Sequence, residues 1–310
     1  MGIEFTPSGV MTITTDFGHR GPFVGTMKGV ILSRVPSTQI IDLTHEVYVH
    51  WPAEAGFWLR RAYCYFPRGT VHLAVVDPGV GTARDMLLVL ADGHAFIAPD
   101  NGLLGEVIEN LDGAVLRLQG RAVDNLKLDN VSATFHGRDV FAPIAAALVA
   151  GDASPADLGE LTEDYIPSIV EPPERRGSQW IGIVITSDNF GNLITNIESQ
   201  ALDGMRNPVV SVGGREIAVA RTYGEVTPGN FLALVNSFGV VEIACAEGSA
   251  AHELGIARGA PVSLADAGLV GKTKSRQDEP NSERSIASPA RAGRSTNPRF
   301  LIIDGPTPAP

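Results

Sequence analysis

Three side chains able to hold and polarise one water molecule occur in two short segments of the sequence. The segment 76–84 (VDPGVGTAR) contains Asp77 and Arg84, and the segment 135–139 (FHGRD) contains His136. A carboxylate, a guanidinium and an imidazole can together orient a water, accept its proton and favour hydroxide character. Both segments lie at the ends of predicted strands, so we expect the three side chains to meet in one catalytic site.

Other polar segments have residue types suited to a charged nucleoside. Asp16 follows the predicted strand 10–15, where its carboxylate can accept hydrogen bonds from a ribose diol. The segment 188–192 (DNFGN) offers Asp188 for an ammonium group, Phe190 for an adenine ring and Asn192 for the adenine edge. The alternative for both segments is an ordinary cap or turn, because Asp, Asn and Gly are common there.

Several other chemistries are disfavoured by the same residues. His136 and Asp139 have a spacing that suits a metal, but Arg138 lies between them and no clustered His or Cys ligand accompanies them. Gly79 and Gly81 supply only half of a dinucleotide fingerprint, and the sequence has no G-x-S-x-G. We therefore expect no metal and no cofactor. The scattered histidines are interpreted as ordinary strand or loop residues: His45, His50, His72 and His94.

The first half of the chain alternates strand and helix signals. We expect strands over 10–15, 38–43 and 70–76, a hairpin of 86–90 with 95–98 across Asp92-Gly93, and helices over 23–34, from Pro52, over 103–111 and over 140–150. This alternation predicts an α/β domain over residues 1–165 with a mostly parallel sheet. Ligands bind such sheets beyond the carboxyl ends of the strands, where Asp16 and Asp77 are placed.

The second half has a different character. A Pro-rich, charged linker is predicted over residues 166–178 and a smaller all-β, barrel-like domain over 179–271. Its expected strands are 180–186, 208–212, 216–220, 231–235, 240–244 and 261–264. Residues 272–310 are rich in Ser, Pro, Arg and Asn without periodicity, so we expect a disordered tail.

Composition restricts the class of protein. The formal net charge of −11 disfavours a nucleic-acid partner and suits a cationic ligand. No apolar stretch is long enough to span a membrane, and we identify no signal peptide. The two cysteines form no C-x-x-C motif and are interpreted as reduced core thiols. These features predict a cytoplasmic protein.

Taken together, these segments resemble the S-adenosyl-L-methionine hydroxide adenosyltransferases, which belong with the fluorinase and chlorinase enzymes. The matching segments occur in the family's order: 13–18 (ITTDFG), 42–47 (DLTHEV), 75–82 (VVDPGVGT), 98–102 (APDNG), 134–139 (TFHGRD), 188–192 (DNFGN) and Asn236-Ser237. The resemblance implies a larger α/β domain and a smaller β-barrel domain. It also implies a homotrimer whose ligand lies between the first domain of one subunit and the second domain of its neighbour.

The resemblance assigns a role to each candidate residue. Asp77, Arg84 and His136 would hold the attacking water, Asp16 the ribose, Asp188 the methionine ammonium, Phe190 and Asn192 the adenine, and Ser237 the methionine carboxylate, with Glu242 in a nearby strand. The implied reaction is hydrolysis of S-adenosyl-L-methionine to adenosine and L-methionine by attack at C5′.

Two alternatives remain beside hydrolysis. A halide adenosyltransferase is the nearer one, although the halogenating relatives have a tyrosine at the position of Asp77 and a Tyr-Ser pair at His136-Gly137. A non-catalytic sensor of S-adenosyl-L-methionine or adenosine is the other, and it would need none of the three water-holding residues. The segments His50-Trp51 and 245–247 depart from common family patterns and bear on the shape of the adenine pocket. Which of the three residues is the base stays open.

Overall fold

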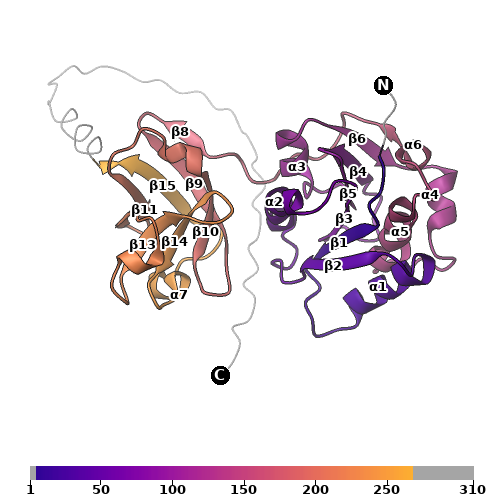
Figure 1. The fold of residues 1–310 in the computed structure, drawn as a ribbon, viewed down its shortest axis with the longest axis horizontal. Coiled ribbons are helices and arrows are strands. Elements are labelled where there is room, and N and C mark those ends of the chain that lie inside the picture. The colour runs from indigo at the N-terminus through magenta and orange to yellow at the C-terminus, as the bar shows by residue number, and fades with distance from the viewer. Residues whose placement is uncertain (1–4, 268–310) are drawn as a thin grey trace, which may run out of the picture. The chain divides into compact units, whose positions relative to one another are not determined.

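The computed structural model of the chain describes residues 5–267, and the predicted tail 272–310 lies outside the described residues. Within that range the strands form two sheets, one of seven strands and one of eight (Figure 1). The elements around the first sheet are β1 (Val10–Thr15), α1 (Phe23–Arg34), β2 (Gln39–Thr44), α2 (Pro52–Ala62), β3 (Val71–Val75), β4 (Met86–Ala91), β5 (His94–Pro99), α3 (Gly105–Asn110), β6 (Gly113–Leu118), α4 (Arg121–Leu126), α5 (Ala142–Ala150), α6 (Pro155–Leu158) and β7 (Gly159–Leu161).

The first sheet is mixed, which corrects the prediction of a mostly parallel sheet. Its strand order is β2-β1-β3-β5-β4-β6-β7. The pairs β1–β2, β1–β3 and β3–β5 are parallel, whereas β5–β4, β4–β6 and β6–β7 are antiparallel. The change of direction arises at the predicted hairpin, where Asp92 and Gly93 both have positive φ and turn β4 back against β5. The short strand β6, which the sequence analysis missed, extends the antiparallel half.

Helices cover both faces of this sheet (Figure 1). On one face, α1 and α5 share a buried apolar cluster with β1 and β3, in which Met27 and Ile31 of α1 join Met11 of β1 and Leu73 of β3. On the other face, α2 and α3 pack against a second cluster that contains Phe96. All five residues of β3 are buried, as expected for a strand covered on both sides. This packing makes β1 and β3 a rigid base for whatever follows their carboxyl ends.

The second sheet is antiparallel along its strand path and nearly closes into a barrel. Its order is β12-β11-β15-β9-β10-β14-β13, with β8 paired to β9, and a single bridge between Val219 and Ala233 links the two ends. Its elements are β8 (Glu174–Arg176), β9 (Gln179–Ser187), β10 (Leu193–Glu198), β11 (Pro208–Val212), β12 (Arg215–Ala218), β13 (Phe231–Val235), β14 (Val240–Cys245), α7 (Ala250–Leu254) and β15 (Pro261–Asp266). The barrel-like prediction is confirmed, and β8 and β10 are the strands that it omitted.

The remaining local elements are short turns of helix. Single 3-10 turns lie at Tyr63–Tyr65, Ser199–Leu202 and Tyr223–Glu225, and a π-helical turn at Gly137–Phe141 leads into α5. β8 lies inside the segment 166–178 that was predicted as a linker. None of the helices between residues 5 and 267 combines the length and the apolar character that crossing a lipid bilayer requires.

Candidate active site

Asp77 and Arg84 form a close ion pair at the carboxyl end of β3. The Nε of Arg84 lies 2.8 Å from each carboxylate oxygen of Asp77, and its Nη2 donates to Oδ2. Both side chains are largely buried, and the guanidinium lies over the ring of Phe141 at 5.3 Å from its centroid. Charged hydrogen bonds in a buried setting hold their geometry well, so this pair is a fixed part of the site.

His136 completes the trio at the start of the π-helical turn. Its Nδ1 lies 3.3 Å from Nη2 of Arg84, although 52 residues separate the two in sequence. Burial lowers the pKa of His136 below its ordinary value, and the neighbouring Arg84 charge lowers it further. The imidazole is therefore neutral near pH 7. Asp77, Arg84 and His136 thus lie in one connected set of contacts, and their catalytic role stays a prediction.

A glycine permits the two segments to approach each other. Gly81 has a φ of +80°, and a Cβ built there would lie 2.3 Å from the carbonyl oxygen of Ala133. Only glycine accepts that conformation and that contact together. The side chain of Asn101 donates to the carbonyl oxygen of Val76 at 2.8 Å and so fixes the chain just before Asp77.

Asp16 lies at the same sheet edge as Asp77. Thr15, the last residue of β1, is in register with Val75, the last residue of the parallel strand β3. The Oδ2 of Asp16 accepts a hydrogen bond from the backbone N–H of His50 at 2.9 Å. His50 has a φ of 61°, an uncommon conformation for a residue other than glycine, and this contact helps to hold it. The first domain thus places four of the predicted residues together.

In the second domain, Asp188 forms the turn that the sequence analysis gave as the alternative. Its Oδ1 accepts from the backbone N–H groups of Phe190 and Asn192, both at 2.9 Å, and its Oδ2 accepts from Nδ2 of Asn192 at 3.0 Å. The turn buries Asn192 and leaves Phe190 77% exposed. A turn does not exclude a ligand, because Oδ2 retains a lone pair for one more donor.

Phe190 and Asn192 also line a depression of about 460 Å³ on this domain. Its other lining residues are Tyr223 and the segment 245–248. The Tyr223 hydroxyl donates to Glu242 at 2.5 Å, and Asn236 Nδ2 donates to the same carboxylate at 3.2 Å. Burial and the nearby Asp188 charge raise the pKa of Glu242, and burial followed by the bond to Glu242 raises the pKa of Tyr223.

Ser237 lies in the hairpin turn between β13 and β14, where its side chain is exposed. The turn is held by Asn236, whose Oδ1 accepts from the backbone N–H of Phe238 at 3.0 Å. Because Asn236 also contacts Glu242, Ser237 belongs to the same polar region as Glu242. Sequence reasoning missed Tyr223, which lies in a loop with no local pattern that points to a role.

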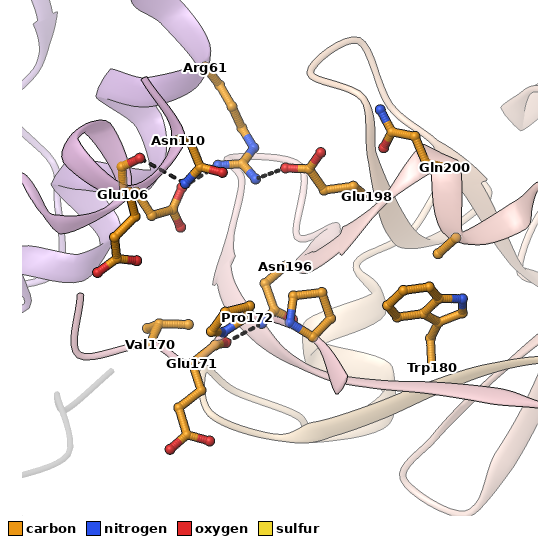
Figure 2. Close-up of a pocket in the computed structure, with 13 residues that line it drawn as sticks. Arg61, Glu106, Asn110, Val170, Glu171, Pro172, Trp180, Asn196, Glu198 and Gln200 are labelled. Carbon is orange, nitrogen blue, oxygen red and sulfur yellow. Dashed lines mark hydrogen bonds and ion pairs between the residues drawn. The ribbon is translucent and has the colours of Figure 1, made fainter. Parts of the chain in front are cut away.

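A pocket of about 450 Å³ lies elsewhere (Figure 2). Arg61, Glu198 and Trp180 line it, and Figure 2 shows Arg61 reaching toward Glu198, from which its Nη2 lies 3.2 Å away. None of the predicted site residues lines this pocket, so its size alone does not identify the site. Among residues 5–267, no group of three or more His, Cys, Asp or Glu side chains is arranged to hold a metal ion.

Comparison with known protein families identifies this chain. The SAM hydroxide adenosyltransferase N-terminal domain matches residues 11–159, and the corresponding C-terminal domain matches residues 182–263. A relative from Thermus thermophilus, named (R)-S-adenosyl-L-methionine hydrolase, is 38% identical over 81% of this chain and 97% of its own length. A protein of the same name from Salinispora tropica is 38% identical over 82% of this chain and 96% of its own length. A fluorinase from Actinoplanes is 28% identical over 63% of this chain and 73% of its own length.

Solved structures agree with the sequence comparisons. An uncharacterized conserved protein from Thermotoga maritima is 36% identical, with a TM-score of 0.76 over 82% of this chain and 99% of its own. A conserved hypothetical protein from Thermus thermophilus is 35% identical, with a TM-score of 0.66 over 82% of this chain and 98% of its own. The matches in both domains show that this chain belongs to the S-adenosyl-L-methionine hydroxide adenosyltransferase family.

Proposed function

We propose that this protein hydrolyses S-adenosyl-L-methionine to adenosine and L-methionine. One observation carries the proposal: the ion pair of Asp77 with Arg84 continues to His136 within 3.3 Å, at the sheet edge that also presents Asp16. The names of the hydrolase relatives support the same reaction.

The chemistry requires little from the protein beyond placing the water. The sulfonium of the substrate carries a neutral leaving group, so its departure needs no general acid. Attack at C5′ needs a water held in line with the breaking C–S bond, with other waters excluded. Arg84 stabilises developing negative charge on the water oxygen, while Asp77 and His136 orient the water.

The contact between Arg84 and His136 also indicates which residue accepts the proton of the attacking water. A guanidinium only donates, so Nδ1 of His136 must be the acceptor and the ring proton must be on Nε2. In that tautomer the Nε2–H donates to the water oxygen. Asp77 then has a lone pair left to accept the proton on Oδ1, which takes one bond from Arg84, whereas Oδ2 takes two. We infer that Asp77 is the proton acceptor and that His136 orients the water.

The second domain supplies the substrate contacts in this proposal. Asp188 lies close enough to Glu242 to raise its pKa, so the two carboxyl groups form an anionic region suited to the methionine ammonium. Phe190 offers an exposed aromatic face for adenine beside the amide of Asn192, and Ser237 is exposed and available to the methionine carboxylate. Since these contacts and the water-holding trio belong to different domains, we propose a homotrimer in which neighbouring subunits share each site.

Isotope and variant experiments test the reaction. Turnover in water labelled with heavy oxygen should place the label on the 5′-hydroxyl of adenosine, and added chloride or fluoride should give no 5′-halo product. Asp77→Ala, Arg84→Ala and His136→Ala should each lower kcat by about 10²–10⁴. Asp16→Ala and Asp188→Ala should chiefly weaken binding. Incorporation of halide, or wild-type kcat in the three water-site variants, would contradict the hydrolase assignment. Binding without any turnover would favour a sensor.

Sedimentation tests the assembly separately. A homotrimer should have about three times the mass of 32.8 kDa. An active monomer would refute a site shared between subunits, but the proposed reaction would stand.

A further inference from the structure

A chain of polar contacts runs from the surface at Lys28 to the buried end of β1. Lys28 Nζ donates to Oδ2 of Asp42 at 2.6 Å, and Oδ1 of Asp42 lies 3.0 Å from Nε2 of His45. The other ring nitrogen, Nδ1, lies 2.8 Å from the hydroxyl of Thr15. The Thr15 hydroxyl also accepts from the backbone N–H of Phe17 at 3.2 Å. Thr15 and His45 are both buried, whereas Asp42 lies at the surface.

The chemistry of the end groups favours one arrangement of the protons in these contacts. Nε2 of His45 makes no regular hydrogen bond, but it lies 3.0 Å from Oδ1 of Asp42, and because an ionised carboxylate only accepts, this contact favours the ring proton on Nε2. Nδ1 is then an acceptor, and the Thr15 hydroxyl must donate to it. That leaves the Thr15 oxygen free to accept from Phe17. Burial lowers the pKa of His45, which keeps the ring neutral as this arrangement requires.

Asp16 lies between Thr15 and Phe17, which are joined by a hydrogen bond from the Phe17 N–H to the Thr15 hydroxyl. Its neighbour Thr15 binds His45 and the N–H of Phe17, so Asp16 occupies the centre of a tight turn. The backbone N–H of Gly18 donates to the carbonyl oxygen of His45 at 2.8 Å. The segment after His45 returns to supply the His50 N–H that binds the Asp16 carboxylate. The turn that carries Asp16 is therefore tied to His45 on both sides.

We propose that His45, oriented by Asp42, is a positioning residue that aims the Asp16 carboxylate at the ribose diol of the substrate. This inference rests on the proposed function only for the role of Asp16. We therefore expect that removing one of the contacts between Asp42, His45 and Thr15 weakens recognition of the two ribose hydroxyls and leaves Asp77, Arg84 and His136 in place.

The same strand offers a matched control. Thr12, three residues earlier in β1, contacts Nδ1 of His72 at 2.8 Å, and both side chains are buried. Thr12→Val and Thr15→Val thus each remove one buried hydroxyl from a Thr–His contact of equal length. A purely structural role predicts a loss of stability in both variants, larger for Thr15→Val because it also loses the bond from the Phe17 N–H, and no difference in ligand selectivity.

The test compares the affinities of adenosine and 2′,3′-dideoxyadenosine by titration calorimetry, with KM and kcat measured alongside. Thr15→Val should lower the preference for adenosine by about tenfold, as expected for one misaligned charged hydrogen bond, and should raise KM more than it lowers kcat. Thr12→Val should keep the wild-type preference. Asp42→Asn, at a surface position, should shift the preference in the same direction as Thr15→Val, and it decides the question if Thr15→Val does not fold.

The outcomes separate the two proposals. If Asp16→Ala loses the preference for adenosine but Thr15→Val and Asp42→Asn keep it, the positioning role of His45 is wrong and the role of Asp16 stands. If Asp16→Ala keeps the preference, both the ribose role of Asp16 and the inference about His45 are overturned. Failure to hydrolyse S-adenosyl-L-methionine, with these preferences intact, would overturn the proposed function alone.

Discussion

Acidification should destabilise this protein through His72, a histidine buried in β3. Burial is the main cause that lowers the pKa of His72 from 6.5 to about 3, and the neighbouring His94 adds to it. Between these two values the unfolded chain binds a proton that the folded chain refuses, so stability is complete above pH 6.5 and falls as the pH drops toward 3. At about 1.36 kcal/mol per pKa unit, His72 alone should remove about 2 kcal/mol between pH 8 and pH 5.

Urea unfolding at a series of pH values measures this loss. His72→Gln removes the titrating ring, so its unfolding free energy should fall about 2 kcal/mol less than that of the wild type between pH 8 and pH 5. The comparison uses the pH dependence, so a constant loss from the missing stacking on Phe96 does not affect it. The control is His252→Gln, because the ring of His252 is exposed. Equal pH dependence in wild type and His72→Gln would refute the idea that burial holds His72 neutral.

Three further predictions concern the site. Gly81→Ala should lower kcat strongly, because its Cβ would meet the carbonyl oxygen of Ala133 at 2.3 Å and separate the segment of Asp77 and Arg84 from that of His136; steady-state kinetics measured beside the melting temperature would show the loss. Arg84→Gln should raise the pKa of His136, since the guanidinium lowers it, and an NMR titration of the ring measures the change. Phe190→Ala should raise KM without lowering the melting temperature, because its ring is 77% exposed; a matching loss of stability would contradict a role confined to the ligand.

Local signals in the sequence predicted much of the first domain. The strand 10–15 and the helix 23–34 have the predicted bounds, and the hairpin at Asp92-Gly93 forms as expected. The prediction of a mostly parallel sheet was wrong because the hairpin reverses the chain in the middle of the sheet. The later strands β6 and β7 then form antiparallel pairs. Their pairing depends on the order of strands in the sheet, which no local sequence pattern specifies.

The site was predictable in its residue types but not in its contacts. The carboxylate, guanidinium and imidazole were found from composition and motif. The 3.3 Å approach of Arg84 to His136 depends on the register of β3 and on the π-helical turn before α5. The segment 188–192 was offered either as a turn or as a ligand site, and the structure shows the turn with Phe190 left exposed. Tyr223 was missed because only folding brings its hydroxyl to Glu242.

Two buried histidines that looked ordinary in sequence, His45 and His72, differ in where they contact β1. Thr12 contacts His72 in the amino-terminal half of the strand, and Thr15 contacts His45 at its carboxyl end. The first pair lies within the core, so its protonation affects the free energy of unfolding. The second lies beside Asp16, so its hydrogen bonds affect how a ligand is held. A histidine in contact with a threonine hydroxyl thus has different consequences at the two ends of β1, because ligands bind beyond the carboxyl ends of parallel strands.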